Sequence, residues 1–217
     1  MGSERRTSWK DMTPEQKKQY FLDYYLVRTL IGAALILFAV VCIRDVLKPK
    51  PDYALQIGIY DVSLSDEEKK DLVYRVQKTL NTAQPVSVDD AYSSLSNDDL
   101  LRIATFSTAG KLDLIIADRE VFEWLAGYGY FKDLSKSLEP DSYGKWQDSI
   151  VVCKGLAMTE SGLLEADAEG NGEPYAAGIR VQNSGLLKYL KELKDPVAGI
   201  ILESEKGKEA VKLLEME

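Results

Sequence analysis

The sequence predicts an α/β fold: a single mixed, mostly parallel sheet flanked by helices and preceded by one transmembrane helix. Two observations predict the sheet. Strand-like runs alternate with amphipathic stretches from residue 53 to residue 127, and the chain ends on another strand and helix. One long apolar run predicts the membrane helix. The expected parts are a cytoplasmic segment (1–23), the transmembrane helix (24–47), a linker (48–52) and an extracytoplasmic α/β domain (53–217).

The apolar run covers residues 29–43, which hold no charged side chain. At ~1.5 Å per residue these residues span about 22 Å, less than the ~30 Å of a hydrocarbon core. Extension to residues 24–47 gives about 36 Å and admits Arg28 and Arg44 near the ends, where long side chains can snorkel to the headgroups. Tyr24 and Tyr25 stand where an aromatic belt is expected. The segment therefore has the length and end residues of a membrane span.

Three alternatives to a membrane span are weaker. A buried core helix is usually amphipathic, whereas residues 30–43 are apolar all round. A cleaved signal peptide needs a small-residue cleavage site after the run, and none follows. Lipidation at Cys42 needs a small residue before it, where Val41 stands.

Charge asymmetry predicts the orientation. Residues 1–48 carry a net charge of +3 and residues 49–217 carry −11, within a total of −8. Six Lys and Arg residues precede the apolar run and three follow it closely. The positive-inside rule then places the N-terminus in the cytoplasm and the α/β domain outside the cell membrane. Thr13-Pro14 reads as a helix start, and the two prolines of residues 48–51 favour an extended linker.

Composition excludes several kinds of site. The chain has no histidine, which removes Ser-His-Asp and Cys-His catalysis and histidine-ligated metals, and two cysteines cannot build a four-thiolate site. The acidic balance argues against nucleic acid as a partner. Phosphate-binding loops, nucleophile elbows and dinucleotide fingerprints are also absent from the sequence. We therefore predict no cofactor and no enzyme activity.

The first half of the domain reads as β-α-β-α-β-α. Ser65 is a helix cap followed by an acidic first turn, and Asn97 is a second cap. The expected strands are 53–60, 84–92 and 112–117, and the expected helices are 65–80, 97–106 and 120–125.

The second half reads differently. A strand is expected over 149–158, and the turn at 169–172 predicts a hairpin between strands 162–168 and 174–181. An amphipathic helix is expected over 184–193, a buried strand over 197–202 and a closing helix over 205–214.

Three stretches resemble type 2 extracytoplasmic solute-binding proteins. The first runs from Asp113 to Asp118 and continues through Phe122, Leu125-Ala126, Gly129 and 131–134; the others are 172–179 and 197–214. The resemblance implies a bacterial host, an extracytoplasmic domain and a ligand held between two lobes. The interval from Leu134 to Gly155 is too short for a second lobe, so we expect a one-lobed version. A transmembrane helix also replaces the lipoprotein anchor usual in the family.

Candidate ligand-binding residues follow from strand ends, because open α/β sheets bind ligands beyond the carboxyl ends of their strands. Tyr60, Asp61, Asp118 and Arg119 stand at such ends, and the resemblance implies that this position faces the ligand. Tyr175, in the second similar stretch, completes the candidate set. The alternative, which we favour for both aspartates, is that they cap turns or helices.

Other motifs have simpler explanations. Residues 167–172 are similar to the start of a calcium-binding loop, but Gly178 occupies the position that needs glutamate. A solvated turn is therefore favoured, and no metal site is predicted. Residues 128–131 could stack a ligand, although a core-and-turn cluster is favoured. Cys153 reads as a buried, inert thiol.

The sequence thus favours a non-catalytic, single-pass membrane module that binds or scaffolds. Its expected partners are the lipid bilayer and a protein of a membrane transport or cell-envelope complex. Two alternatives stay open. One is a sensor or capture domain for a small solute. The other is a carboxylate-dependent envelope hydrolase, which needs two carboxyl groups about 5–9.5 Å apart.

Overall fold

A computed structural model describes residues 12–24, 26–47, 52–94, 98–165, 168–182 and 185–216. The chain divides into two compact units, Met1–Lys50 and Pro51–Glu217. Nearly all of the predicted linker, the Asn97 cap and Asp167 of the calcium-like motif lie outside the described residues.

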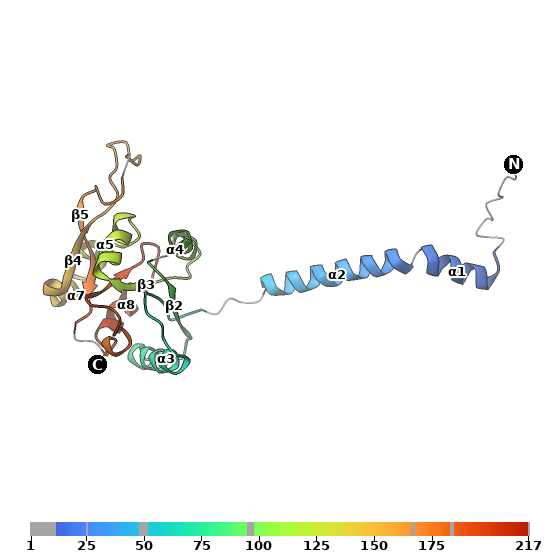
Figure 1. The fold of residues 1–217 in the computed structure, drawn as a ribbon, viewed down its shortest axis with the longest axis horizontal. Helices are drawn as coiled ribbons and strands as arrows, with labels where there is room; N and C mark the ends of the chain where they lie inside the picture. Colours follow the sequence, from blue (N-terminus) through green and yellow to red (C-terminus); the bar gives the residue numbers. More distant parts are fainter. Residues whose placement is uncertain are drawn as a thin grey trace. The chain divides into compact units, whose positions relative to one another are not determined.

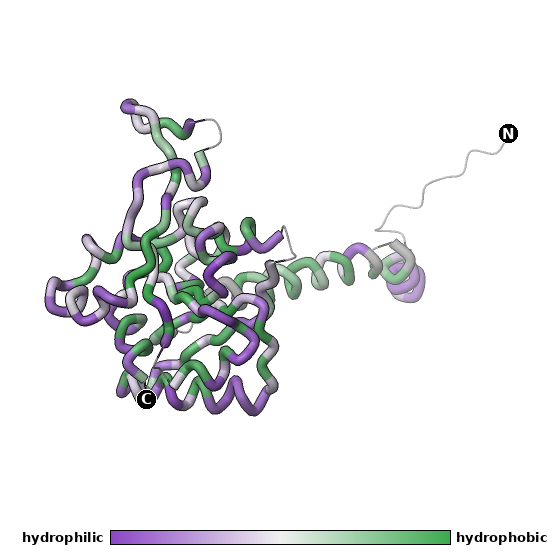
Figure 2. The backbone as a smooth tube through the Cα atoms, turned by 60° about the vertical axis from the view of Figure 1, so that its left-hand side comes forward, coloured by the Kyte–Doolittle hydropathy of each residue, from purple (hydrophilic) through white to green (hydrophobic). Residues whose placement is uncertain are grey.

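The first unit holds helices α1 (Pro14–Tyr24) and α2 (Leu26–Leu47). The predicted helix start is confirmed, because the Gln16 backbone N–H donates to Thr13 Oγ1 at 3.3 Å and the Thr13 N–H donates to Gln16 Oε1 at 3.0 Å. The α2 tube is almost wholly apolar in Figure 2, and from residue 28 to residue 44 its side chains are exposed except at Gly32. None of the helices in the described part of the chain is both long and apolar enough to cross a membrane. The side chains of Tyr24 and Tyr25, the predicted aromatic belt, are outside the description.

The second unit is built on one six-stranded sheet with the order β2-β1-β3-β6-β5-β4. The strands are β1 (Leu55–Tyr60), β2 (Val86–Tyr92), β3 (Leu114–Asp118), β4 (Ile150–Lys154), β5 (Pro174–Arg180) and β6 (Pro196–Ile200). The pairs β1–β2 and β1–β3 are parallel, whereas β3–β6, β5–β6 and β4–β5 are antiparallel.

The predicted α/β class and mixed sheet are confirmed, but the sheet is less parallel than expected. Four strands run in one direction, yet only two of the five neighbouring pairs are parallel. Antiparallel strands can be joined without a crossover helix. The connections β4–β5 and β5–β6 carry no α-helix among their described residues, and they join two of the three antiparallel pairs.

Helices cover both faces of this sheet (Figure 1). One face packs against α3 (Asp66–Leu80), α6 (Leu134–Ser137) and α8 (Gly207–Leu214), through residues that include Leu72, Val76, Leu134 and Leu213. The other face packs against α4 (Asp98–Thr108) and α5 (Arg119–Gly127), through Ile103, Phe122 and Leu125. The strands supply both layers because their side chains alternate: Leu114 and Ile116 face the first core, Ile115 and Ala117 the second.

The Ser65 cap is confirmed. The hydroxyl oxygen of Ser65 accepts a hydrogen bond from the Glu68 backbone N–H at 3.2 Å. The Glu68 carboxylate in turn accepts one from the Ser65 backbone N–H at 3.0 Å, which completes a capping box. The helix ends at Asn81 in the left-handed conformation, with φ 52°.

Two glycines make room for one phenylalanine beneath α5. A Cβ at Gly178 would lie 2.5 Å from the Phe122 ring, and one at Gly199 would lie 2.6 Å from it. The Phe122 ring stacks on Phe131 with centroids 4.4 Å apart and an interplanar angle of 10°. These neighbouring positions on β5 and β6 therefore need glycine for α5 to approach the sheet.

Two predicted elements are wrong. The described residues of the expected strand 162–168 form no ladder with β5, whose partners are β4 and β6; they contribute one isolated bridge, from Leu164 to Met158. The helix expected over 184–193 is a series of tight turns around the 3-10 turn η3 (Leu187–Tyr189). Its backbone bonds join residues three apart, as from Tyr189 N–H to Leu186 O, but the predicted apolar stripe is still buried.

The connection between β4 and β5 stands out from the unit in Figure 1, and we call its described residues, 155–165 and 168–173, the finger. Close backbone contacts fix its base: Gly170 N–H donates to Gly127 O at 3.1 Å, and Gly172 N–H donates to Gly155 O at 3.0 Å. Its tip is a turn in which Thr159 N–H donates to Leu163 O at 2.8 Å. Three apolar side chains near the tip are exposed: Met158, Leu163 and Leu164, at 58%, 68% and 60%.

Candidate functional site

The carboxyl ends of β1 and β3 lie next to each other at one edge of the sheet, because the two strands are parallel neighbours. From β1 the chain continues into α3 on one face, and from β3 into α5 on the other face. Such a reversal is where open α/β sheets form their ligand crevice. Four of the five predicted ligand-binding residues stand at this edge, which we call the switch-point edge.

Tyr60 points into the core. It is fully buried, and its hydroxyl has no hydrogen-bond partner among the described residues. Burial, followed by the nearby Asp99 charge, raises the pKa of Tyr60 far above its usual value. The side chain therefore does not reach solvent to meet a ligand.

Asp61 closes a turn. Its backbone is left-handed, with φ 52°, and its Oδ1 accepts from the Ser94 N–H at 2.9 Å. The exposed carboxylate thus ties the end of β1 to the segment after β2, as the capping alternative predicts.

Asp118 caps α5. Its Oδ1 accepts from the Arg119 N–H at 3.1 Å and from the Asp195 N–H at 2.8 Å. The carboxylate therefore holds both the helix start and the turn before β6.

Arg119 belongs to a short charge network at the same edge. Its Nε donates to Glu123 Oε1 at 2.7 Å, and its guanidinium lies 3.7 Å from Asp195 Oδ2. Asp195 Oδ1 in turn lies 3.0 Å from Arg180 Nε. The Glu123 hydrogen bond raises the pKa of Arg119 further. Sequence spacing could not reveal Arg180 or Asp195, because they reach the edge from distant strands.

Tyr175 is not part of the switch-point edge. It lies near the start of β5 opposite Cys153, and β5 runs in the same direction as β3, so Tyr175 is towards the opposite edge. Its hydroxyl donates to Ala126 O at 3.2 Å, and burial raises its pKa strongly. The structure gives it a packing role at the base of the finger, where a Cβ at Gly155 would lie 3.2 Å from its ring.

A buried aromatic cluster lies beneath α4. The rings of Tyr60 and Tyr92 stack at 5.3 Å, and the Arg102 guanidinium lies 4.4 Å from the centre of the Tyr92 ring. Arg102 also pairs with Asp89 at 2.5 Å. Burial, with the Asp89 charge, raises the pKa of Tyr92 to about 12, so both phenols stay neutral.

Residues 128–131 and Cys153 are packing elements, as favoured. Phe131 is buried, and the Tyr130 hydroxyl donates to Leu100 O at 3.1 Å. Cys153 is buried, and its pKa is raised to about 11 by burial and the Glu123 charge. Its thiol is therefore a poor nucleophile. In the described part of the chain, no cluster of three acidic or cysteine side chains is placed to hold a metal ion.

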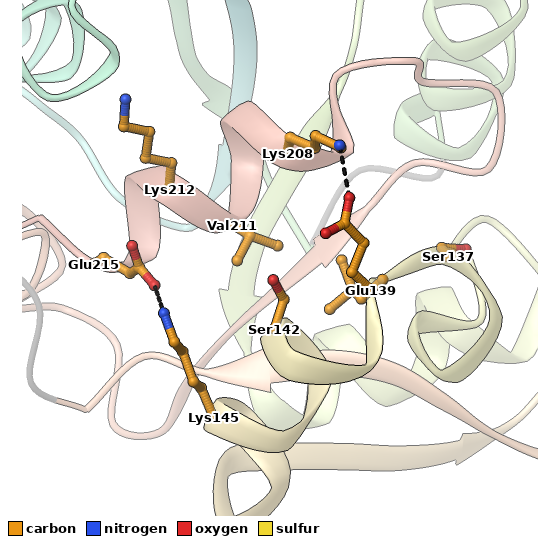
Figure 3. Close-up of a pocket in the computed structure, with 9 residues that line it drawn as sticks. Ser137, Glu139, Ser142, Lys145, Lys208, Val211, Lys212 and Glu215 are labelled. Atoms are coloured by element: carbon orange, nitrogen blue, oxygen red, sulfur yellow. Dashed lines mark hydrogen bonds and ion pairs between the residues drawn. The ribbon is translucent and has the colours of Figure 1, made fainter.

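A small cavity of about 260 Å³ opens between α7 (Pro140–Trp146) and α8 (Figure 3). The half-buried Leu138 and the buried Val211 form its apolar lining. Two ion pairs cross it, Lys208–Glu139 at 2.7 Å and Lys145–Glu215 at 3.8 Å. We call it the α7–α8 groove. Sequence reasoning missed it, because α7 follows α6 within a stretch with no clear periodicity.

Ser142 points between the two ion pairs, and the Lys212 amine extends away from Ser142 at the rim (Figure 3). Within the part of the chain that the structure describes, no carboxylate pairs with the Lys212 amine. The groove therefore has an apolar floor and, at its rim, a lysine that no described carboxylate neutralises.

Comparison with known proteins gives no match: no family model, no curated protein and no solved structure is similar to this chain.

Proposed function

We propose that this chain is a non-catalytic module held at a membrane by α2, whose α/β unit binds protein rather than solute. The observation that carries the membrane attachment is the exposed apolar surface of α2. Leu35, Leu37 and Phe38 are 63%, 66% and 69% exposed, on a helix of 22 residues that is about 33 Å long. Apolar surface of this extent marks a membrane or protein contact.

Protein binding is favoured over solute capture by the chemistry of the switch-point edge. Asp61 and Asp118 are engaged with backbone N–H groups, Arg119 is paired with Glu123, and Tyr60 is buried. A solute that bound at this edge would have to displace the hydrogen bonds and the ion pair that stabilise the fold there. Because Asp61 and Asp118 already hold backbone N–H groups, the same hydrogen bonds argue against a pair of free catalytic carboxylates at the switch-point edge.

Orientation is part of the proposal. The excess of Lys and Arg before α2 favours an orientation with the N-terminus in the cytoplasm and residues 53–217 outside the cell membrane. The resemblance to solute-binding proteins favours a transport or envelope complex as the setting.

Liposome flotation of the full chain tests the attachment. We expect the chain to float with neutral phospholipid vesicles, and the double variant Leu35→Glu, Leu37→Glu to remain at the bottom, because burying two carboxylates in hydrocarbon is costly. The matched control, Tyr74→Glu with Leu101→Glu, adds the same charge at exposed positions of the α/β unit, which are 64% and 73% exposed. It should float like the wild type. A wild-type chain that does not float, or an α2 variant that does, would overturn the attachment.

Protease treatment of intact cells tests the orientation. We expect protease added outside to digest residues 53–217 and spare an N-terminal tag. A spared α/β unit in cells whose chain is membrane-bound would reverse the orientation.

A further inference from the structure

Two surfaces of the α/β unit differ in shape and in the sign of their charge: one protrudes and is acidic, and the other is concave and basic. The finger protrudes and presents Met158, Leu163 and Leu164 to solvent. The α7–α8 groove is concave, with an apolar floor and lysines at its rim.

The charged residues in the sequence of the β4–β5 connection are all acidic. Between Lys154 and Arg180 the sequence has five acidic residues and no Lys or Arg. Glu160 and Glu165 flank the three exposed apolar side chains, and the structure describes no ion pair for either. An apolar tip with acidic flanks suits a pocket that is apolar inside and basic outside.

The groove has those properties. Leu138 and Val211 form its floor, and Lys145, Lys208 and Lys212 stand around it with two glutamates, so its local charge is positive within a unit of net charge −12. Its volume of about 260 Å³ is below the ~300 Å³ at which small-molecule sites usually begin. It suits one or two aliphatic side chains better than a free ligand.

We propose that the finger of one chain docks into the α7–α8 groove of a second copy, with Leu163 or Leu164 entering the groove and Glu160 near Lys212. The two surfaces differ, so the contact is head-to-tail and can continue from copy to copy as a ring or an open chain. This inference rests on the protein-binding half of the proposed function and is independent of membrane attachment.

The contact is small, and small interfaces are weak, so we expect association at high local concentration and use covalent trapping to detect it. Two full-length chains with different tags are prepared in a Cys42→Ser background; Cys153 is buried and stays. One carries Ser161→Cys at the finger tip and the other Ser142→Cys in the groove. They are mixed under mild oxidation in detergent, with fewer than one chain per micelle.

We expect the mixed disulfide dimer to dominate over both homodimers, and a chain carrying both cysteines to give a ladder of multimers. A control pairing Thr108→Cys, exposed on α4, with Ser142→Cys should stay at background. Adding Leu163→Ser and Leu164→Ser to the finger chain should abolish the mixed dimer.

Charge reversal separates docking from random collision. Glu160→Lys or Lys212→Glu alone should reduce the trapping rate, and the two together, one on each partner, should restore it. The proposal would be overturned if the homodimers were as abundant as the mixed dimer. It would also be overturned if the rate of mixed-dimer formation did not change with the leucine and charge substitutions. Because these readouts do not depend on α2, failure here is distinguishable from failure of flotation.

Discussion

The hydroxyl of Ser204 donates a hydrogen bond of 2.7 Å to Oδ1 of Asp113, a buried contact between residues 91 positions apart. The other carboxylate oxygen, Oδ2, accepts from the Gln56 N–H at 2.9 Å. Asp113 precedes β3, Gln56 is in β1 and Ser204 follows β6, so one carboxylate fastens three neighbouring strands at their shared edge.

Ser204→Ala should lower the free energy of unfolding by about 1–3 kcal/mol, because it leaves a buried carboxylate oxygen without its donor. Urea unfolding followed by tryptophan fluorescence measures this loss. Ser142→Ala, a partly exposed serine for which the structure describes no hydroxyl bond, is the control and should change little. An equal loss in both variants would contradict the assignment.

The cost of Ser204→Ala should also depend on pH. Burial raises the pKa of Asp113, with the Ser204 and Gln56 bonds opposing it. A raised folded-state pKa means that the group's stabilising contribution is fully present below the unfolded pKa of ~3.9 and is lost as pH rises through the folded value. Ser204 bonds the ionised form, so its removal should cost more at pH 7 than at pH 4. A cost that does not vary with pH would contradict the assignment of the Ser204 bond to the ionised form of Asp113.

Gly199→Ala should destabilise the unit by about 1–3 kcal/mol, because its new Cβ would lie 2.6 Å from the fully buried Phe122 ring. Gly144→Ala is the matched control: a Cβ there meets nothing within 4 Å, and alanine in helix α7 should stabilise by about 0.5–1 kcal/mol. Opposite signs in thermal or urea unfolding are the expected result. A neutral Gly199→Ala would mean that α5 can move away from the sheet.

Asp118→Ala should cost about 0.5–2 kcal/mol of stability through loss of the α5 cap, and Asp118→Asn less, because an amide oxygen can still accept the N–H groups of Arg119 and Asp195. Unfolding midpoints measure both, with Asp148→Ala at an exposed site as control. A stable Asp118→Ala variant would free this carboxylate for a ligand and revive the solute-binding alternative.

Asp71 should give the chain part of its acid sensitivity. Hydrogen bonds from Lys188 at 2.6 Å and Tyr189 at 2.7 Å lower the pKa of Asp71 to about 2. The folded-state pKa is therefore below the unfolded value of ~3.9, so the contribution is present above pH ~4 and is lost as pH falls towards about 2. Because Asp71 is half-exposed, the effect should be modest and weakened by salt.

The measurement is the change in urea midpoint between pH 5 and pH 2. The urea midpoint of Asp71→Asn should fall less between pH 5 and pH 2 than that of the wild type. The midpoint of Asp148→Asn should fall as much as that of the wild type. Parallel curves for all three proteins would show that the Lys188 and Tyr189 bonds do not favour the ionised form.

The first half of the fold could be predicted from the sequence because its signals are local. The cap at Ser65, the acidic turn after it and the apolar stripe through Leu72 and Val76 fix α3 without reference to the rest of the chain. The strand β3 is a short apolar run bounded by Gly110 and the Asp118 cap, and that pattern is also local.

The second half depends on contacts between distant residues, and there the sequence misleads. The stripe of Leu186, Tyr189, Leu190 and Leu193 fits a helix, yet turns with bonds three residues apart bury the same side chains. Nothing local distinguishes the two, since Tyr189 is held by Asp71 from another helix. The sequence predicts the strand β5 at nearly the right residues but pairs it with 162–168 instead of β4. The register of β5 with β4 depends on the sheet and not on the turn at 169–172.

The candidate site shows the same division. Strand-end reasoning correctly brought Tyr60, Asp61, Asp118 and Arg119 to one edge, but it could not tell that their polar atoms are engaged within the chain. For the two aspartates that depended on Ser94 and Asp195, which arrive from elsewhere in the fold. The pair of Arg119 with Glu123 is local, four residues apart on α5.

The double duty of Asp118 has a consequence for redesign. A protein engineer who wished to install a small-molecule receptor at the switch-point edge would first have to give α5 another cap and the turn at Asp195 another anchor. Until both substitutes exist, each gain in affinity there would be offset by loosening of the scaffold that presents it.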